Sequence, residues 1–132
     1  MNAAYQSQAE AYQRNHYYTA DRGTVLLMLY QGAIDFLKKA KSRLGEGDLE
    51  GKGAYIARAH AIISEFLTSL NRDAGTELPR KLEELYRFML DQLVQAHLGN
   101  DSKPLDDVIS LLETLLEGWQ GAVIQARKEG LL

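Results

Sequence analysis

The apolar run Leu26–Leu37 constrains the fold of this chain more than any other stretch. A bundle helix needs only about three apolar positions in seven, and this run, interrupted only by Gln31, Gly32 and Asp35, exceeds that requirement. Asp21 lies just ahead of the run, and its carboxylate can accept hydrogen bonds from the free N–H groups that open a helix. The sequence therefore predicts a helix here with apolar residues on more than one face.

Four segments of the sequence carry apolar residues at alternating steps of three and four, the spacing that places side chains on one face of a helix. Polar turns separate these segments. Pro79 and Pro104 fall where first helical turns are expected, and a first turn tolerates a residue without an N–H. The predicted helices span residues of about 22–44, 49–71, 77–98 and 102–128.

Short turns between helices of similar length favour antiparallel neighbours. We therefore predict an all-α protein, an antiparallel up-down four-helix bundle at residues 21–132. Residues 1–20 are too polar to hold a core and are expected to form a short N-terminal arm or helix, docked or mobile. Trp119 is assigned to core packing. The core stripe expected on the first helix consists of Leu26, Leu29, Ala33, Phe36 and Ala40.

Composition excludes several classes of protein. The 132 residues include no cysteine, which rules out disulfides and cysteine-ligated metals. The formal net charge is −3 and the basic residues are dispersed, which argues against nucleic acid as a partner. No apolar run approaches the ~20 residues of a membrane span, and residues 1–20 lack the pattern of a signal peptide. We expect a single-domain cytoplasmic protein without stable membrane insertion.

The sequence shows no pattern of residues that indicates a catalytic site, a metal site or a cofactor site. Bundles that bind two metals place Glu three residues before His, but Ala57 and Val94 precede His60 and His97. His60 leaves one alternative open, because histidine phosphotransfer domains are also four-helix bundles with a histidine on a helix. In those domains Lys-Gly soon follows the histidine, whereas Ile62 and Ile63 follow His60 here. We expect no enzymatic activity.

Apolar residues beyond the core stripes suggest grooves on the bundle surface. Gly118, Gly121 and Ala122 strengthen this interpretation, because small residues let another backbone approach closely. An amphipathic helix laid in a groove is a known mode of recognition. The helix could belong to a partner, to a second copy of the chain or to the N-terminal arm. A self-associating structural bundle is therefore a second alternative.

Four stretches resemble one protein family in the same order along nearly the whole chain. Thr19-Ala20 followed by Leu26–Leu37 is similar to the opening of the bacterial flagellar export chaperones that bind flagellin, the FliS-like family. Ile62–Asn71 resembles the end of that family's second helix. Leu82–Met89 and Leu112–Trp119 resemble its third helix and its tryptophan-bearing last helix. Asp21-Arg22 departs from the family's usual Ser-Pro and still allows a helix cap.

The resemblance implies a cytoplasmic, non-enzymatic chaperone. Such a protein binds the disordered C-terminal region of flagellin, prevents premature polymerisation and keeps the subunits competent for flagellar type III secretion. Flagellar export-gate components, an anti-sigma factor and a homodimer stay open as further partners. In this family the N-terminal arm lies near the client-binding surface. The predicted partner-binding residues are Tyr5 and Tyr12 of the arm and Tyr30, Ile34, Tyr55, Ile62, Leu111 and Ile124 as exposed groove residues.

Overall fold

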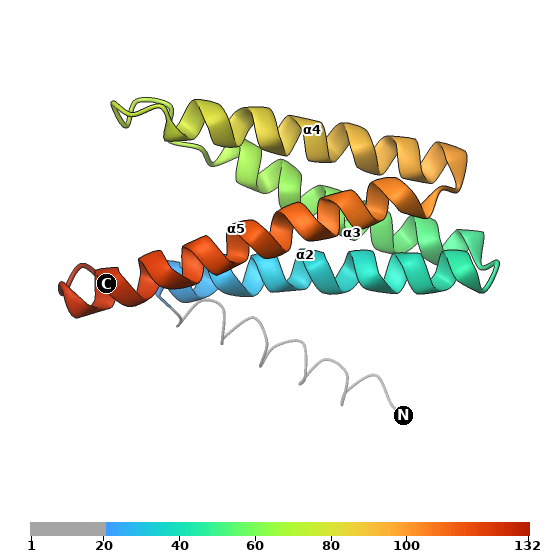
Figure 1. Ribbon diagram of the computed structural model, residues 1–132, viewed down its shortest axis with the longest axis horizontal. Helices are drawn as coiled ribbons and strands as arrows, with labels where there is room; N and C mark the ends of the chain where they lie inside the picture. The colour runs from blue at the N-terminus through green and yellow to red at the C-terminus, as the bar shows by residue number, and fades with distance from the viewer. Residues whose placement is uncertain (1–20) are drawn as a thin grey trace, which may run out of the picture.

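A computed structural model describes residues 21–132, and within this range the chain forms four helices and no strand. The helices are α2 (Arg22–Gly45), α3 (Leu49–Thr68), α4 (Leu78–Gly99) and α5 (Ser102–Lys128). Each helix packs on the next and reverses direction, and α5 returns to pack on α2, so that the four helices form a closed ring (Figure 1). The predicted all-α, antiparallel four-helix bundle is confirmed. The predicted arm lies outside the described residues.

Aspartates begin three of the four helices. The carboxylate of Asp21 accepts a hydrogen bond of 2.7 Å from the Thr24 N–H, and that of Asp48 accepts one of 2.9 Å from the Gly51 N–H. Asp101 caps α5 in the same way through the Lys103 N–H at 3.0 Å. Helix α4 instead begins at Leu78-Pro79, where the proline has no N–H to satisfy. Local chemistry thus sets where each helix starts.

The end of α5 is fastened to the start of α2 (Figure 1). The Arg127 guanidinium donates to the Asp21 carboxylate at 3.0 Å and to the Thr24 hydroxyl at 2.5 Å. After α5 the chain turns through Gly130, which has a φ of 73°, and Leu132 returns to contact α2 at Gly23. A Cβ at Gly23 would lie 2.9 Å from the Leu132 Cδ1 atom and 3.1 Å from both Val123 methyl groups, so a larger residue here would require these side chains to shift.

One aromatic ring from each helix lies in the core or, in the case of the half-buried Trp119, packs against it. Tyr30 of α2 stacks on Phe66 of α3 with ring centroids 4.6 Å apart, and Phe66 lies 5.6 Å from Tyr86 of α4. Trp119 of α5 meets Tyr30 at 6.5 Å in a tilted arrangement. The two tyrosine hydroxyls hydrogen-bond to each other at 2.5 Å. Burial raises the pKa of both hydroxyls, so each stays protonated and can serve as donor or acceptor.

The expected core stripe of α2 is partly wrong. Ala33 and Ala40 are buried as expected, but Leu26, Leu29 and Phe36 are only half-buried. The fully buried positions are instead Tyr30, Ile34 and Leu37. Helix α2 is covered on two sides, by α3 and by α5, so its buried arc is centred between these neighbours. Because the run Leu26–Leu37 is apolar almost all round, its sequence does not mark the centre of that arc.

Lys52 is the one buried charged residue among residues 21–132. Its ammonium group donates to the His97 carbonyl oxygen at 3.0 Å and to the Asn100 side-chain oxygen at 2.5 Å. The carbonyls at the end of a helix lack partners within the helix and carry partial negative charge. Lys52, in the first turn of α3, therefore provides a hydrogen-bond donor for the carbonyl groups at the end of α4 and links the two helices.

Removing one hydroxyl of the tyrosine pair is expected to destabilise the bundle. Tyr30→Phe leaves the Tyr86 hydroxyl buried without its partner, and Tyr86→Phe does the reverse, each at a cost of about 1–3 kcal/mol. The double variant should cost less than the sum of the two single variants, because it leaves no orphaned hydroxyl. Urea unfolding of the three variants measures this, and strictly additive losses would contradict the role assigned to the pair.

The Asp21 cap should make stability depend on pH in a defined direction. The Thr24 N–H, together with Arg127, lowers the pKa of the Asp21 carboxyl in the folded state below its ordinary value of 3.8. The stabilising effect of the charge is therefore complete above pH 3.8 and is lost as the pH falls through the lowered folded-state pKa. Thermal melting of wild type and Asp21→Asn across this range should show their difference shrinking in acid. A constant difference would contradict the assignment.

Candidate functional site

Three apolar grooves lie between neighbouring helices on the outside of the bundle. The groove between α2 and α3 has a volume of about 380 Å³. Val25, Leu26 and Leu29 of α2 form one wall and Phe66 of α3 forms the other. The charged groups of Arg22 and Glu65 stand at its rim. Since Phe66 also stacks on buried Tyr30, the wall of this groove is continuous with the core.

A second groove, between α4 and α5, has a volume of about 220 Å³. Leu78 and Leu82 line its α4 side, and Leu115 and Trp119 line its α5 side. The indole N–H of Trp119 is buried and has no hydrogen-bond partner among the described residues. Gly118 meets no other atom within 4 Å of where its Cβ would lie, so no part of the described chain uses the close approach that this glycine allows.

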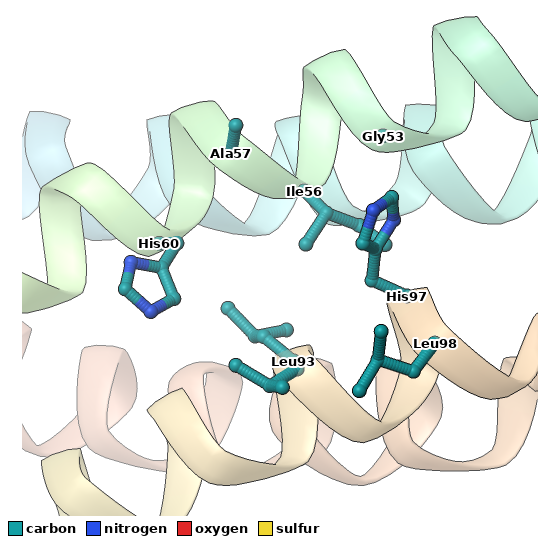
Figure 2. Close-up of a pocket in the computed structure, with 8 residues that line it drawn as sticks. Gly53, Ile56, Ala57, His60, Leu93, His97 and Leu98 are labelled. Carbon is teal, nitrogen blue, oxygen red and sulfur yellow. The ribbon is translucent and has the colours of Figure 1, made fainter.

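The third groove, between α3 and α4, has a volume of about 270 Å³ (Figure 2). Ile56 and Leu93 point into it, and His60 and His97 flank it from opposite helices. The His97 ring passes so close to α3 that a Cβ at Gly53 would lie 3.0 Å from its Cε1 atom. The groove is therefore apolar at its floor, and its two ends carry polar imidazoles.

The structure corrects the predicted exposure of two site residues. Tyr30 and Ile34 were expected in exposed grooves, but their side chains are 0% and 1% exposed, so this prediction is wrong. The physical reason is the position of α2 between α3 and α5, which turns both side chains into the core. Tyr5 and Tyr12 lie outside the described residues.

The other predicted site residues lie at the surface but do not form one cluster. Tyr55 and Ile62 are half-buried on the α3 side of the α2–α3 face, where the Ile62 Cδ1 atom lies 3.9 Å from a Cβ built on Gly32. Leu111 is half-buried one turn before Leu115 on α5, in line with the α4–α5 groove. Ile124 is 55% exposed and lines none of the three apolar grooves.

The exposed apolar residues of α4 were not predicted as site residues from the sequence. Leu98 is 75% exposed, Leu78 is 52% exposed and Val94 is 44% exposed, and each of them lines a groove. Val94 and Leu98 stand one turn apart, beside the core residue Leu93 and outside the core stripe. The four-residue spacing of Val94 and Leu98, away from the core stripe, could have indicated a second apolar face on α4.

Residues 21–132 contain no cluster of three or more histidine, aspartate or glutamate side chains placed to hold a metal ion. His60 is half-buried at the edge of the α3–α4 groove, with its Nδ1 atom 3.4 Å from the Ser64 hydroxyl. None of the four described helices combines the length and the apolar character needed to cross a membrane. Contact between apolar surfaces is the chemistry that the grooves offer.

The fold is that of a bacterial flagellar chaperone. A crystal structure described as a flagellar chaperone from bacteria is similar to this chain with a TM-score of 0.74. The match covers 89% of this chain and 98% of that one, at 22% sequence identity.

The sequence comparisons establish the family. The family model described as flagellar protein FliS matches residues 4–126. The flagellar secretion chaperone FliS of Bacillus subtilis is 33% identical over 96% of this chain and 93% of its own length. The flagellar secretion chaperone FliS of Salmonella typhimurium is 36% identical over 70% of each chain. The chain belongs to the FliS family of flagellar secretion chaperones, which confirms the resemblance and disfavours phosphotransfer through His60.

A matched pair of isoleucines tests the corrected assignment. Ile34→Ala removes a side chain from a closed core and is expected to lower the free energy of unfolding by about 2–5 kcal/mol. Ile124→Ala removes the same atoms from an exposed position and should change it by at most about 0.5 kcal/mol. Chemical denaturation of both variants measures the contrast, and equal losses would contradict the burial assigned to Ile34.

Proposed function

We propose that this chain is a cytoplasmic chaperone that binds the disordered C-terminal region of flagellin. Bound in this way, flagellin subunits would not polymerise prematurely and would stay competent for flagellar type III secretion. Membership of the FliS family carries the proposal, because relatives over most of the chain are named flagellar secretion chaperones. The apolar grooves supply a physical means of binding.

The grooves suit a client that folds as it binds. A disordered segment pays the entropy of ordering at the moment of binding, so it needs apolar area to offset that cost. The α2–α3 groove offers Leu26 and Leu29 for this contact, with Ile62 beyond them, and the α4–α5 groove offers Leu115 with Leu111 beyond it. We assign the main client contact to the α2–α3 groove, whose volume is the largest of the three apolar grooves.

The N-terminal arm, residues 1–20, is connected to the bundle close to the α2–α3 groove. The arm joins the bundle next to Arg22, which stands at the rim of the α2–α3 groove. We expect Tyr5 and Tyr12 to cover apolar surface in the free protein and to be displaced by the client. Hydrogen exchange of residues 1–20 tests this, because protection should fall when the client binds. Equal protection with and without the client would contradict it.

Isothermal titration with the C-terminal segment of flagellin from the same organism tests the function. We expect one-to-one binding, a negative heat-capacity change from burial of apolar surface and a gain of helix by circular dichroism. Absence of binding, together with light scattering that shows a stable dimer, would favour the self-associating bundle instead. Export-gate components and an anti-sigma factor are further expected partners, and pull-down with each purified protein tests them.

Single charges placed in the grooves should separate client contacts from the fold. Ile62→Asp and Leu111→Asp are each expected to weaken client binding by about tenfold or more, because each buries an unpaired charge in the complex. Leu49→Asp is the matched control, since Leu49 is 48% exposed at the first residue of α3 and lines none of the three apolar grooves. Melting temperature is measured in parallel. If a variant loses helicity together with binding, its residue is a core residue and not a client contact.

A further inference from the structure

Two aromatic rings and two cations form a separate patch on the outer face of α2 and α3. We call Phe36, Lys39, Tyr55 and Arg58 the basic–aromatic patch. The rings of Phe36 and Tyr55 stack with centroids 6.1 Å apart. The Arg58 guanidinium lies 5.2 Å from the Tyr55 centroid and 5.8 Å from that of Phe36, and the Lys39 ammonium lies 5.7 Å from the Tyr55 ring.

The two cations of this patch have no acidic partner among residues 21–132. Lys39 and Arg58 are exposed and take part in none of the ion pairs of the described chain. Nearby Lys41, by contrast, pairs with Asp106 at 2.7 Å, and Arg43 pairs with Glu46 at 3.2 Å. The patch therefore carries local positive charge on a chain whose formal net charge is −3.

The patch continues the face on which the α2–α3 groove lies. Leu29 of the groove and Phe36 of the patch are seven residues apart on α2, and Glu65 of the groove and Arg58 of the patch are seven residues apart on α3. Two helical turns thus separate the groove from the patch on each helix, with Gly32 between them. From Val25 to Lys39 this strip is about 21 Å long at a rise of about 1.5 Å per residue, which suits a helix of roughly 14 residues.

We propose that the basic–aromatic patch binds acidic side chains at one end of the client helix whose apolar face fills the α2–α3 groove. This inference rests on the proposed function and adds the chemistry and direction of the bound segment. Charge complementarity supports it, because Lys39 and Arg58 lie over the aromatic rings and neither takes part in an ion pair with a described residue. The rings present apolar surface beside those charges. An acidic end placed there fixes which way the helix lies along the strip.

Neutral variants of the two cations test the inference. The probe is the C-terminal flagellin segment used above, titrated into wild type, Lys39→Gln, Arg58→Gln and the double variant at low and at high ionic strength. We expect a loss of about 3–5-fold for each single variant and about tenfold for the double variant at low salt. The loss should largely vanish at high salt, because salt screens exposed charges.

Lys38→Gln is the matched control. It removes the same charge from the next residue of the same helix, but Lys38 lines the polar face between α2 and α5 beside Glu113 and Glu117. Binding by this variant should stay within about twofold of wild type. An equal loss in Lys38→Gln would show a general charge effect and would overturn the inference, as would unchanged binding by the Lys39 and Arg58 variants.

A second titration identifies the acidic residues of the client. Each aspartate or glutamate of the segment is changed to asparagine or glutamine, and an acid bound at the patch should no longer matter in the Arg58→Gln background. If the loss of affinity from every acidic substitution simply adds to the loss from Arg58→Gln, the inference is overturned. It is also overturned if a fluorescent RNA oligonucleotide binds the wild-type protein and binds the same variants more weakly. If wild type fails to bind flagellin at all, the proposed function fails first.

Discussion

The hydrogen bond between the Tyr30 and Tyr86 hydroxyls is the interaction on which the rest of the bundle depends. Buried hydroxyls are costly unless both are satisfied, so α2 and α4 must meet at one register across the core. Phe66 and Trp119 pack against the same pair from α3 and α5, and each also forms part of a groove wall. The polar contact at the centre therefore fixes the position of apolar surfaces at the outside.

The outer surfaces expose apolar side chains that do not contribute to the stability of the core. Leu98 and Leu78 are large apolar side chains left more than half exposed at groove edges, where a polar residue would interact better with water. Under the proposed function such surface is needed, because a disordered client must bury apolar area to offset the entropy that it loses when it becomes ordered. Residues that contribute little to the fold of the free protein are thus the ones expected to matter for its complexes.

Local chemistry was readable from the sequence, and the orientation of helix faces was not. The Asp21 cap and the positions of Pro79 and Pro104 indicated where three helices begin, since each signal depends on neighbouring residues alone. Which residues of α2 are buried depends on the helices that flank it. An almost uniformly apolar run does not indicate which of its faces those helices cover. Tyr30 and Ile34 were misplaced for this reason. Val94 was missed because one apolar residue beside a core stripe is an ordinary feature of helices.

The bond from Arg127 to Asp21 joins residues 106 positions apart in sequence and closes the ring of helices. The α2–α3 and α4–α5 pairs are hairpins of local contacts, whereas the α2–α5 interface has high sequence separation. On a ribosome α2 is synthesised long before α5, so the α5-facing side of α2 lacks its α5 contacts until the end of the chain has been made. The same apolar run that makes this a good bundle helix makes the unfinished chain prone to early association.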